Sequence, residues 1–408
     1  MVNKSPAVSN GENHKAVDVQ LASQCDQNLI TRRVLLKKFL AALIGIPLVA
    51  IITYLLFTPV PIAPVAYTLA PNAGYTGVHA TNTRLADLKT IKLNGEAGPE
   101  HIVIGPDNKL YTGMESGNIV RMNLDGSEPS TFAYTDGRSL GMAFDAKGNL
   151  IVADAQTGLL SIDPKGTVFV LTNHFGGELL LFPDAVTVAK NGKIYFTDAS
   201  TRFGMRESGS TFEASILDLL EGQPTGRVFE FDPEKKTSRL IAHGLSFANG
   251  IALSEDETTL FVNETGRYRV WKIAVAANNL EISKADSLKS VQATVLLDNL
   301  PGYPDNLMRG LDGKIWLGFA ATRNPDIDRL SEWPSLRKVI MRLPRSMWPI
   351  PKPYGHVIAF TEDGKIMQDL QDPSGAYPET TAVTETKERL YIQSLHAKRL
   401  GWMENKQP

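Results

Sequence analysis

A short unit of polar turn, apolar strand, small-residue turn and second strand recurs along this chain and constrains its fold more than any other feature. Six copies can be aligned, and they begin at residues 105, 145, 190, 254, 311 and 387. In the fifth copy an Asp312-Gly313 turn leads into Lys314-Ile315-Trp316-Leu317, a run typical of a strand. Repeats of about 40 residues with about four strands each are typical of a β-propeller, because one such sheet cannot bury both faces alone. We therefore predict an all-β, six-bladed β-propeller over residues 90–408.

The N-terminal part of the chain differs from the repeats in composition. Residues 1–30 are polar and lack periodicity, so we expect a disordered cytoplasmic tail. A basic flank then precedes an apolar run over residues 39–57, and about 19 residues in a helix span roughly 28 Å, enough to cross a bilayer. We predict a signal anchor, an uncleaved transmembrane helix, over residues 31–58. Residues 59–89 form the linker that leads into the propeller.

Charges beside the apolar run indicate an orientation and a compartment. Basic residues stand only before the run, at Arg32, Arg33, Lys37 and Lys38, whereas the segment after it is uncharged and rich in proline. The positive-inside rule then places the N-terminus in the cytoplasm. The arginine pair also resembles a twin-arginine export signal. Because the single cysteine, Cys25, precedes the run, we expect a cysteine-free propeller in the periplasm, anchored to the inner membrane.

The overall charge and two insertions bear on the partners of the chain. The 42 basic and 44 acidic residues leave a net charge of -2, so no nucleic-acid partner is expected. Insertions at residues 201–225 and 322–354 interrupt the repeats and carry apolar clusters. The second mixes arginine, tryptophan and aliphatic residues, which suits a lid over a pocket, a contact with the membrane interface or a packed surface loop. The membrane is therefore an expected partner through the N-terminal helix, with this insertion as a second candidate contact.

Oxygen-bearing side chains precede the aromatic strand of several repeats. In the fifth repeat they directly follow Pro304, in a stretch whose prolines indicate a turn. Propeller symmetry would turn all of these side chains toward the central axis: Glu100, Asp184, Asn249, Asp305 and Asn306. Three carboxylates held close together repel one another unless a cation lies between them. Calcium takes about six to eight hard oxygen ligands in flexible geometry, so we predict one catalytic calcium ion bound by these five residues.

Five stretches of the chain carry a family resemblance: Tyr195-Phe196-Thr197-Asp198-Ala199-Ser200, Gly226-Arg227-Val228, Phe247-Ala248-Asn249-Gly250, Pro301-Gly302-Tyr303-Pro304-Asp305-Asn306 and Thr322-Arg323-Asn324-Pro325. From about residue 90 the chain resembles the calcium-dependent six-bladed propellers, namely the gluconolactonases and regucalcin, the paraoxonases and the strictosidine-synthase-like proteins. Among these the likeness is greatest to the adipocyte plasma membrane-associated proteins. The resemblance implies that the five oxygen-bearing residues lie where paraoxonase-type members hold a catalytic calcium ion.

Three departures from the family pattern bear on the reaction. Asp184 stands where the family commonly has asparagine, which adds a negative charge to the predicted metal site. Paraoxonases carry a catalytic histidine before their second blade, and the matching stretch Arg138-Ser139-Leu140-Gly141-Met142 offers Leu140 instead. Strictosidine synthases use a glutamate ahead of the last blade, where this chain has Thr381. The presence of Thr381 in place of this glutamate disfavours the reaction of strictosidine synthases, the condensation of an amine with an aldehyde.

The predicted activity is the calcium-dependent hydrolysis of a small lactone or aryl ester. The ion would polarise the carbonyl group, with Asp305 or Asp184 as the general base for a water molecule or as a direct nucleophile. His174 is a further catalytic candidate, whereas we expect a structural role for His101. The main alternative is a non-catalytic propeller that binds a ligand or partner around a structural calcium ion. A redox propeller with a quinone cofactor would draw only on the possible twin-arginine signal.

Overall fold

The computed structural model describes residue 1 and residues 11–283, 291–349 and 351–406. The chain divides into two compact units, residues 1–60 with 339–345 and residues 61–338 with 346–408. Each unit is described by itself.

The first unit is dominated by one long helix, α1 (Gly11–Phe57). Within the described residues it is the one helix whose length and apolar composition would allow it to cross a membrane. Arg342, in the same unit, donates from Nη1 to the Leu55 carbonyl (2.8 Å) and from Nε to the Thr58 carbonyl (2.6 Å). A positively charged side chain therefore provides hydrogen bonds to backbone carbonyl groups at the C-terminal end of the helix. The structure corrects the expected disorder over residues 11–30, which are helical. Helix propagates through this stretch because residues 12–44 contain no glycine or proline.

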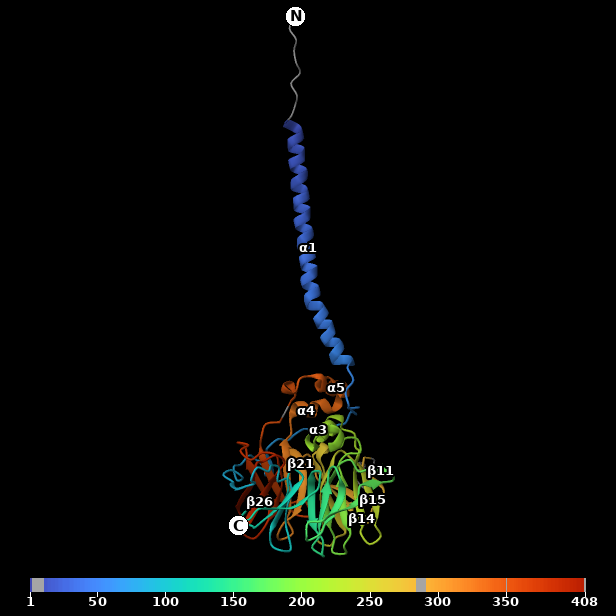
Figure 1. The fold of residues 1–408 in the computed structure, drawn as a ribbon, viewed down its shortest axis with the longest axis vertical. Helices are drawn as coiled ribbons and strands as arrows, with labels where there is room; N and C mark the ends of the chain where they lie inside the picture. Colours follow the sequence, from blue (N-terminus) through green and yellow to red (C-terminus); the bar gives the residue numbers. More distant parts are fainter. Residues whose placement is uncertain (2–10, 284–290, 350, 407–408) are drawn as a thin grey trace. The chain divides into compact units, whose positions relative to one another are not determined.

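The second unit contains six sheets in chain order, as predicted (Figure 1). The first three consist of β2 (Ile102–Ile104), β3 (Leu110–Gly113), β4 (Asn118–Met122) and β5 (Ser130–Tyr134); β6 (Ser139–Phe144), β7 (Leu150–Asp154), β8 (Gly158–Ile162) and β9 (Val168–Thr172); and β12 (Pro183–Val188), β13 (Ile194–Asp198), β14 (Gly226–Asp232) and β15 (Thr237–Leu245), with β19 (Leu280–Glu281) added to the third. A hairpin of β10 (His174–Phe175) and β11 (Glu178–Leu179) stands apart from these sheets.

The remaining three sheets complete the propeller. They consist of β16 (Ala248–Leu253), β17 (Thr259–Glu264), β18 (Arg269–Ala274) and β20 (Ala293–Leu297); β21 (Gly302–Arg309), β22 (Ile315–Thr322), β23 (Gly355–Phe360) and β24 (Ile366–Asp372); and β25 (Thr380–Glu385), β26 (Arg389–Ser394), β27 (Arg399–Glu404) and β1 (Lys89–Lys92). In the last sheet β1 is antiparallel to β27, so the first strand of the chain completes the last blade. This pairing ties the two ends of the propeller together.

Both faces of most blades are buried, which explains the continuous apolar runs in the sequence. Every residue of β7 is buried, for example. Six apolar clusters fill the spaces between successive blades, and one of them places Trp316 of the fifth blade against Val383 and Ile392 of the sixth. The first strands of the blades also contact one another in a closed ring, in the order β2, β6, β12, β16, β21, β25 and back to β2. The strands that carry the predicted site therefore surround a single axis.

Both insertions form short helices, as the apolar clusters in the sequence indicate. The first contains α2 (Met205–Ser208) and α3 (Thr211–Glu221), and the second contains α4 (Pro325–Arg329), α5 (Pro334–Arg342) and the 3-10 turns Leu330–Glu332 and Arg345–Met347. Figure 1 shows α3 and α4 at one end of the propeller. The buried Arg337 of α5 donates from Nη1 to the carbonyls of Leu220 (2.9 Å) and Glu221 (3.1 Å), at the end of α3. The two insertions are thereby fastened to each other.

Candidate metal centre

Every predicted metal ligand except Glu100 lies in the first strand of a blade, at an irregularity of the pairing. The register shifts between Pro183 and Val186, between Ala248 and Ile251, and between Pro304 and Leu307. A β-bulge bends the strand and re-aims the side chains at that point. Pro304 therefore lies within β21, at a bulge that tolerates proline, and not in a turn before the strand as its sequence context suggests. The bulges are what present Asp184, Asn249, Asp305 and Asn306 to the axis.

Glycine allows these bulged strands to approach one another closely. A Cβ atom on Gly250 would lie 2.4 Å from the Asp305 carbonyl oxygen, and one on Gly141 would lie 2.7 Å from that of Asp184. These distances are too short for any side chain without movement of the backbone. The Asn263 amide donates to the Asp305 carbonyl, and Thr197 Oγ1 donates to that of Asn249 (2.8 Å). Second strands thus hold the bulges of the neighbouring blades in place.

Four oxygen atoms at this centre are buried and have no hydrogen-bond partner among the described residues: Oδ1 of Asp184, Asn249, Asp305 and Asn306. Each of these four residues is at most 4% exposed. Unsatisfied buried acceptors are costly, and a group of them at one place indicates a missing donor or cation. Four hard oxygens, two of them from carboxylates, are ligands that suit calcium. The residues present therefore fit the predicted ion.

Glu100 is engaged differently from the other four residues. Its Oε2 accepts from Arg138 Nη2 (2.7 Å) and Nε (3.2 Å), and both side chains are 5% exposed. The guanidinium group lies against Gly98, where a Cβ atom would come within 2.8 Å of it, and Gly98 has φ +69°. Arg138 lies in the stretch that matches the histidine-bearing loop of paraoxonases, but the sequence alone does not show that it pairs with Glu100. A fixed positive charge therefore competes with a metal ion for this carboxylate.

Burial and mutual repulsion raise the pKa of the axial carboxyl groups. The pKa of Asp184 is well above its ordinary value because the group is buried and because Asp305 and Glu100 add negative charge nearby. Burial and the Glu100 charge likewise raise the pKa of Asp305, although a hydrogen bond with Asn249 opposes the rise. Burial also raises the pKa of Glu100, while Arg138 lowers it. The three carboxyl groups are therefore close enough to interact, and a cation would favour their charged forms.

The predicted catalytic histidine lies on the surface, in the hairpin of β10 and β11. His174 is exposed on β10, and its Nδ1 hydrogen-bonds to Asn173 Oδ1 (2.6 Å). No hydrogen bond among the described residues links it to Asp184 or Asp305, and its catalytic role stays a prediction. His101 is buried, and burial lowers its pKa to about 4, so that it is uncharged at neutral pH.

Two of the three positions that depart from the family pattern, Leu140 and Thr381, are buried. Leu140 is buried on β6, among the side chains of the second blade. Thr381 is fully buried on β25, and its hydroxyl donates to the Glu100 carbonyl oxygen (2.6 Å). Neither side chain can act as a general acid or base at neutral pH.

The six blades define the chain as a six-bladed β-propeller with buried oxygen-bearing side chains on the first strands of its blades. The strictosidine synthase family matches residues 184–278, and the N-terminal region of the strictosidine synthase-like family matches residues 77–122. Strictosidine synthase-like 4 of Arabidopsis thaliana is 36% identical over a region that covers 59% of this chain and 62% of that protein. The adipocyte plasma membrane-associated protein of Bos taurus is 32% identical over 88% of this chain and 87% of its own length. The chain belongs to this strictosidine synthase-like family.

A comparison of structures agrees with the assignment of the fold. A gluconolactonase from Xanthomonas campestris superimposes with a TM-score of 0.55 at 18% identity, over 85% of this chain and 97% of the gluconolactonase. At this identity the similarity shows the shared propeller fold and not a shared reaction.

Proposed function

We propose that the chain is a calcium-dependent hydrolase of small lactones or aryl esters, with its reaction centre at the propeller axis. The observation that carries the proposal is the group of four buried, unpartnered oxygens on the bulged strands. A calcium ion held by these oxygens would polarise the substrate carbonyl and stabilise negative charge that develops on it. The name of the gluconolactonase with the same fold adds support for a lactone substrate.

The chain's own residues would divide the remaining work. Asp305 or Asp184 accepts the proton of the attacking water molecule, because each carboxylate has a buried oxygen without a partner among the described residues and the two groups interact electrostatically. Asn249 and Asn306 contribute amide oxygens without adding charge. Arg138 balances the charge of Glu100, which keeps the total negative charge at the axis within what one divalent ion can neutralise.

A non-catalytic binding propeller is the second candidate, and two observations favour it. Leu140 and Thr381 occupy the positions where relatives place catalytic side chains, and both are packed into the structure. In addition, surface hollows lie beside the first and last blades, for example at Asn108 and Arg389, where a partner could bind. In this function calcium would hold the bulged strands together and have no part in a reaction.

One experiment on the full-length chain in detergent tests both functions. Thermal unfolding and the hydrolysis of an aryl acetate and a small lactone are followed with calcium and with a chelator. Binding of calcium to the folded state alone stabilises it by about 4 kcal/mol at 1,000 times the Kd. We expect the chelator to lower the Tm and to abolish hydrolysis. A Tm response without hydrolysis would favour the binding propeller, and no response of either kind would contradict the metal centre.

We further propose that α1 anchors the chain in the inner membrane with the propeller in the periplasm. The support is the apolar window of α1 together with the basic residues that precede it. On the second insertion Trp333 and Met347 are each 62% exposed and provide apolar surface for a lipid contact. Cys25 is exposed and is the single cysteine of the chain. Its reactivity with a thiol reagent therefore shows on which side of the membrane the N-terminal segment lies.

The orientation can be measured with a membrane-impermeant thiol reagent on spheroplasts that contain the full chain. We expect Cys25 to react only after lysis, because it lies on the cytoplasmic side. In a Cys25→Ser background, a Glu234→Cys variant at an exposed turn of the propeller should react before lysis. The reverse pattern would show that the N-terminus is outside.

A further inference from the structure

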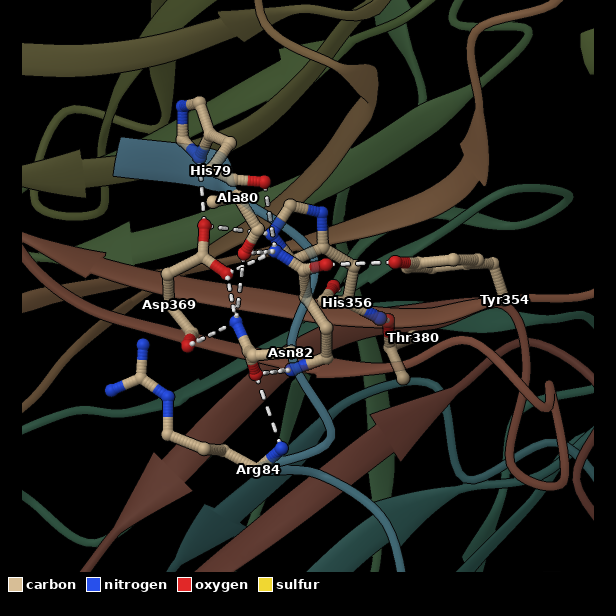
Figure 2. Close-up of polar contacts among 9 residues, drawn as sticks. His79, Ala80, Asn82, Arg84, Tyr354, His356, Asp369 and Thr380 are labelled. Atoms are coloured by element: carbon tan, nitrogen blue, oxygen red, sulfur yellow. Dashed lines mark hydrogen bonds and ion pairs between the residues drawn. The ribbon is translucent and has the colours of Figure 1, made fainter. Parts of the chain in front are cut away.

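A second group of ligand atoms lies away from the axis, at the outer strands of the fifth blade. Nδ1 of His79, Nε2 of His356 and Oδ2 of Asp369 lie within 4.8 Å of one another, and in the described part of the chain no other trio of His, Cys, Asp or Glu does so. The carboxylate oxygen is 2.7 Å from His79 Nδ1 and 3.1 Å from His356 Nε2 (Figure 2). His356 is on β23 and Asp369 on β24, whereas His79 ends a 3-10 turn (Gly77–His79) before the first strand.

The other oxygen of the carboxylate is fixed by two amide groups. Asp369 Oδ1 accepts from Asn82 Nδ2 (3.1 Å) and from Gln371 Nε2 (2.5 Å). Gln371 is itself held by the Tyr354 hydroxyl, which donates to its Oε1 (2.7 Å). Figure 2 shows Asn82 beside Asp369, whose Oδ2 contacts the two histidines. Such outer contacts are typical of carboxylates that bind a metal, because they set the direction of the free oxygen.

The two histidines are the only ion-pair partners of Asp369 within the described part of the chain. Asp369 is 2% exposed, and among the described residues its hydrogen-bond and ion-pair partners include no lysine or arginine. Two imidazoles and one carboxylate, brought together at a largely buried place, are ligands that zinc prefers.

The distances suit such an ion. Zinc–ligand bonds of about 2.1 Å in a tetrahedral arrangement separate the ligand atoms by roughly 3.4 Å. The separations of 2.7 and 3.1 Å from Asp369 Oδ2 require only a small outward movement of the side chains, and the two histidine nitrogens lie within 4.8 Å of each other. The buried hydroxyl of Tyr75 has no partner, and its ring lies 5.4 Å from that of His356, so it is available to hydrogen-bond a fourth ligand such as water.

We propose that His79, His356 and Asp369 form a zinc site that fastens the segment before the first strand to the fifth blade. The site is separate from the axial oxygens and takes a softer ion. Its role is to clamp residues 79–82 onto β23 and β24, where Gln371 Nε2 also donates to the His79 carbonyl (3.2 Å). His79 is the more exposed histidine, with 16% of its side chain accessible, and so provides the route by which the ion enters.

Titration of the chelator-stripped, full-length chain with Zn²⁺ by calorimetry, and with Co²⁺ by visible absorption, tests this proposal. We expect one tight equivalent of Zn²⁺ and the d–d bands of Co²⁺ bound by nitrogen and oxygen ligands. His79→Gln should weaken the affinity at least about 100-fold, because loss of an outer-sphere partner alone costs about 10–100-fold. Glutamine can still donate to Asp369, so this variant should keep the wild-type Tm in the absence of metal.

Two control variants make the result specific. His396→Gln alters another histidine whose Nδ1 contacts a carboxylate, Glu379 (2.7 Å), and should leave zinc binding unchanged. Asp305→Asn alters the axial centre and should also leave it unchanged. If the wild type binds no zinc, or if His79→Gln binds it equally well, the cluster is a clasp of hydrogen bonds alone and the proposal fails. Loss of zinc binding in Asp305→Asn would instead assign the ion to the axis.

Discussion

Asp305→Asn should abolish hydrolysis and most of the stabilisation by calcium. Removal of a general base lowers the rate by about 100- to 10,000-fold. The variant also loses one of the two carboxylates, Asp184 and Asp305, that each have an oxygen without a partner among the described residues at the axis. In a chelator the same variant should be at least as stable as the wild type, because it no longer buries an uncompensated carboxylate. The two proteins should therefore exchange their order of Tm when calcium is added.

The raised pKa of Asp305 adds a pH dependence to this comparison. Without metal, the folded state holds the proton to a higher pH than the unfolded chain does. The resulting stabilisation is present below the ordinary pKa of 3.8 and is lost as the pH rises through the raised value. In a chelator the advantage of Asp305→Asn over the wild type should thus grow with pH, as measured by Tm between pH 4 and 8.

Asp163→Asn provides a matched control for Asp305→Asn. Asp163 lies in the turn between β8 and β9, where its Oδ1 accepts from two backbone amides. The substitution removes a charge of the same kind but leaves the axis unchanged, so both calcium responses should remain. Full hydrolysis by Asp305→Asn would exclude Asp305 as the base, and an unchanged calcium shift would exclude it as a ligand.

Arg138→Met should lower the free energy of unfolding by about 3–5 kcal/mol in a chelator, because it leaves the buried Glu100 without its cation. With calcium the loss should be smaller, since the released carboxylate can then turn to the ion. The rise in Tm on adding calcium should therefore be larger in this variant than in the wild type. Differential scanning calorimetry of the full chain with and without calcium measures both quantities.

Lys314→Met is the control for this prediction. It breaks another buried ion pair, between Lys314 Nζ and Glu385 Oε1 (2.7 Å), which joins the fifth and sixth blades. Its cost in stability should be comparable, but its calcium response should equal that of the wild type. If Arg138→Met shows no larger response than Lys314→Met, Glu100 is a structural partner of Arg138 and not a calcium ligand.

The periodic part of the sequence was sufficient to predict the propeller. Each turn–strand unit reports local preferences, and the six copies reappear as six blades with apolar clusters between them. The axial positions of Asp184, Asn249 and Asp305 also follow from the repeat, because equivalent positions in a closed ring face the same axis. Their binding of calcium stays a prediction. The polar stretch over residues 11–30 was the exception, since a helix can extend into a segment whose composition alone suggests disorder.

Tertiary structure alone decided how the side chains pair. Arg138 reaches Glu100 across 38 residues, and His79 reaches Asp369 across 290. Residue composition contains no signal for contacts between such distant positions. The Arg138–Glu100 pair forms when the first two blades pack side by side, whereas the pairing of β1 with β27 brings the segment before the first strand back to the last blades. The sequence by itself therefore determined the repeating scaffold and its axial oxygens, whereas the packing of the blades decided the charge partners and the second cluster.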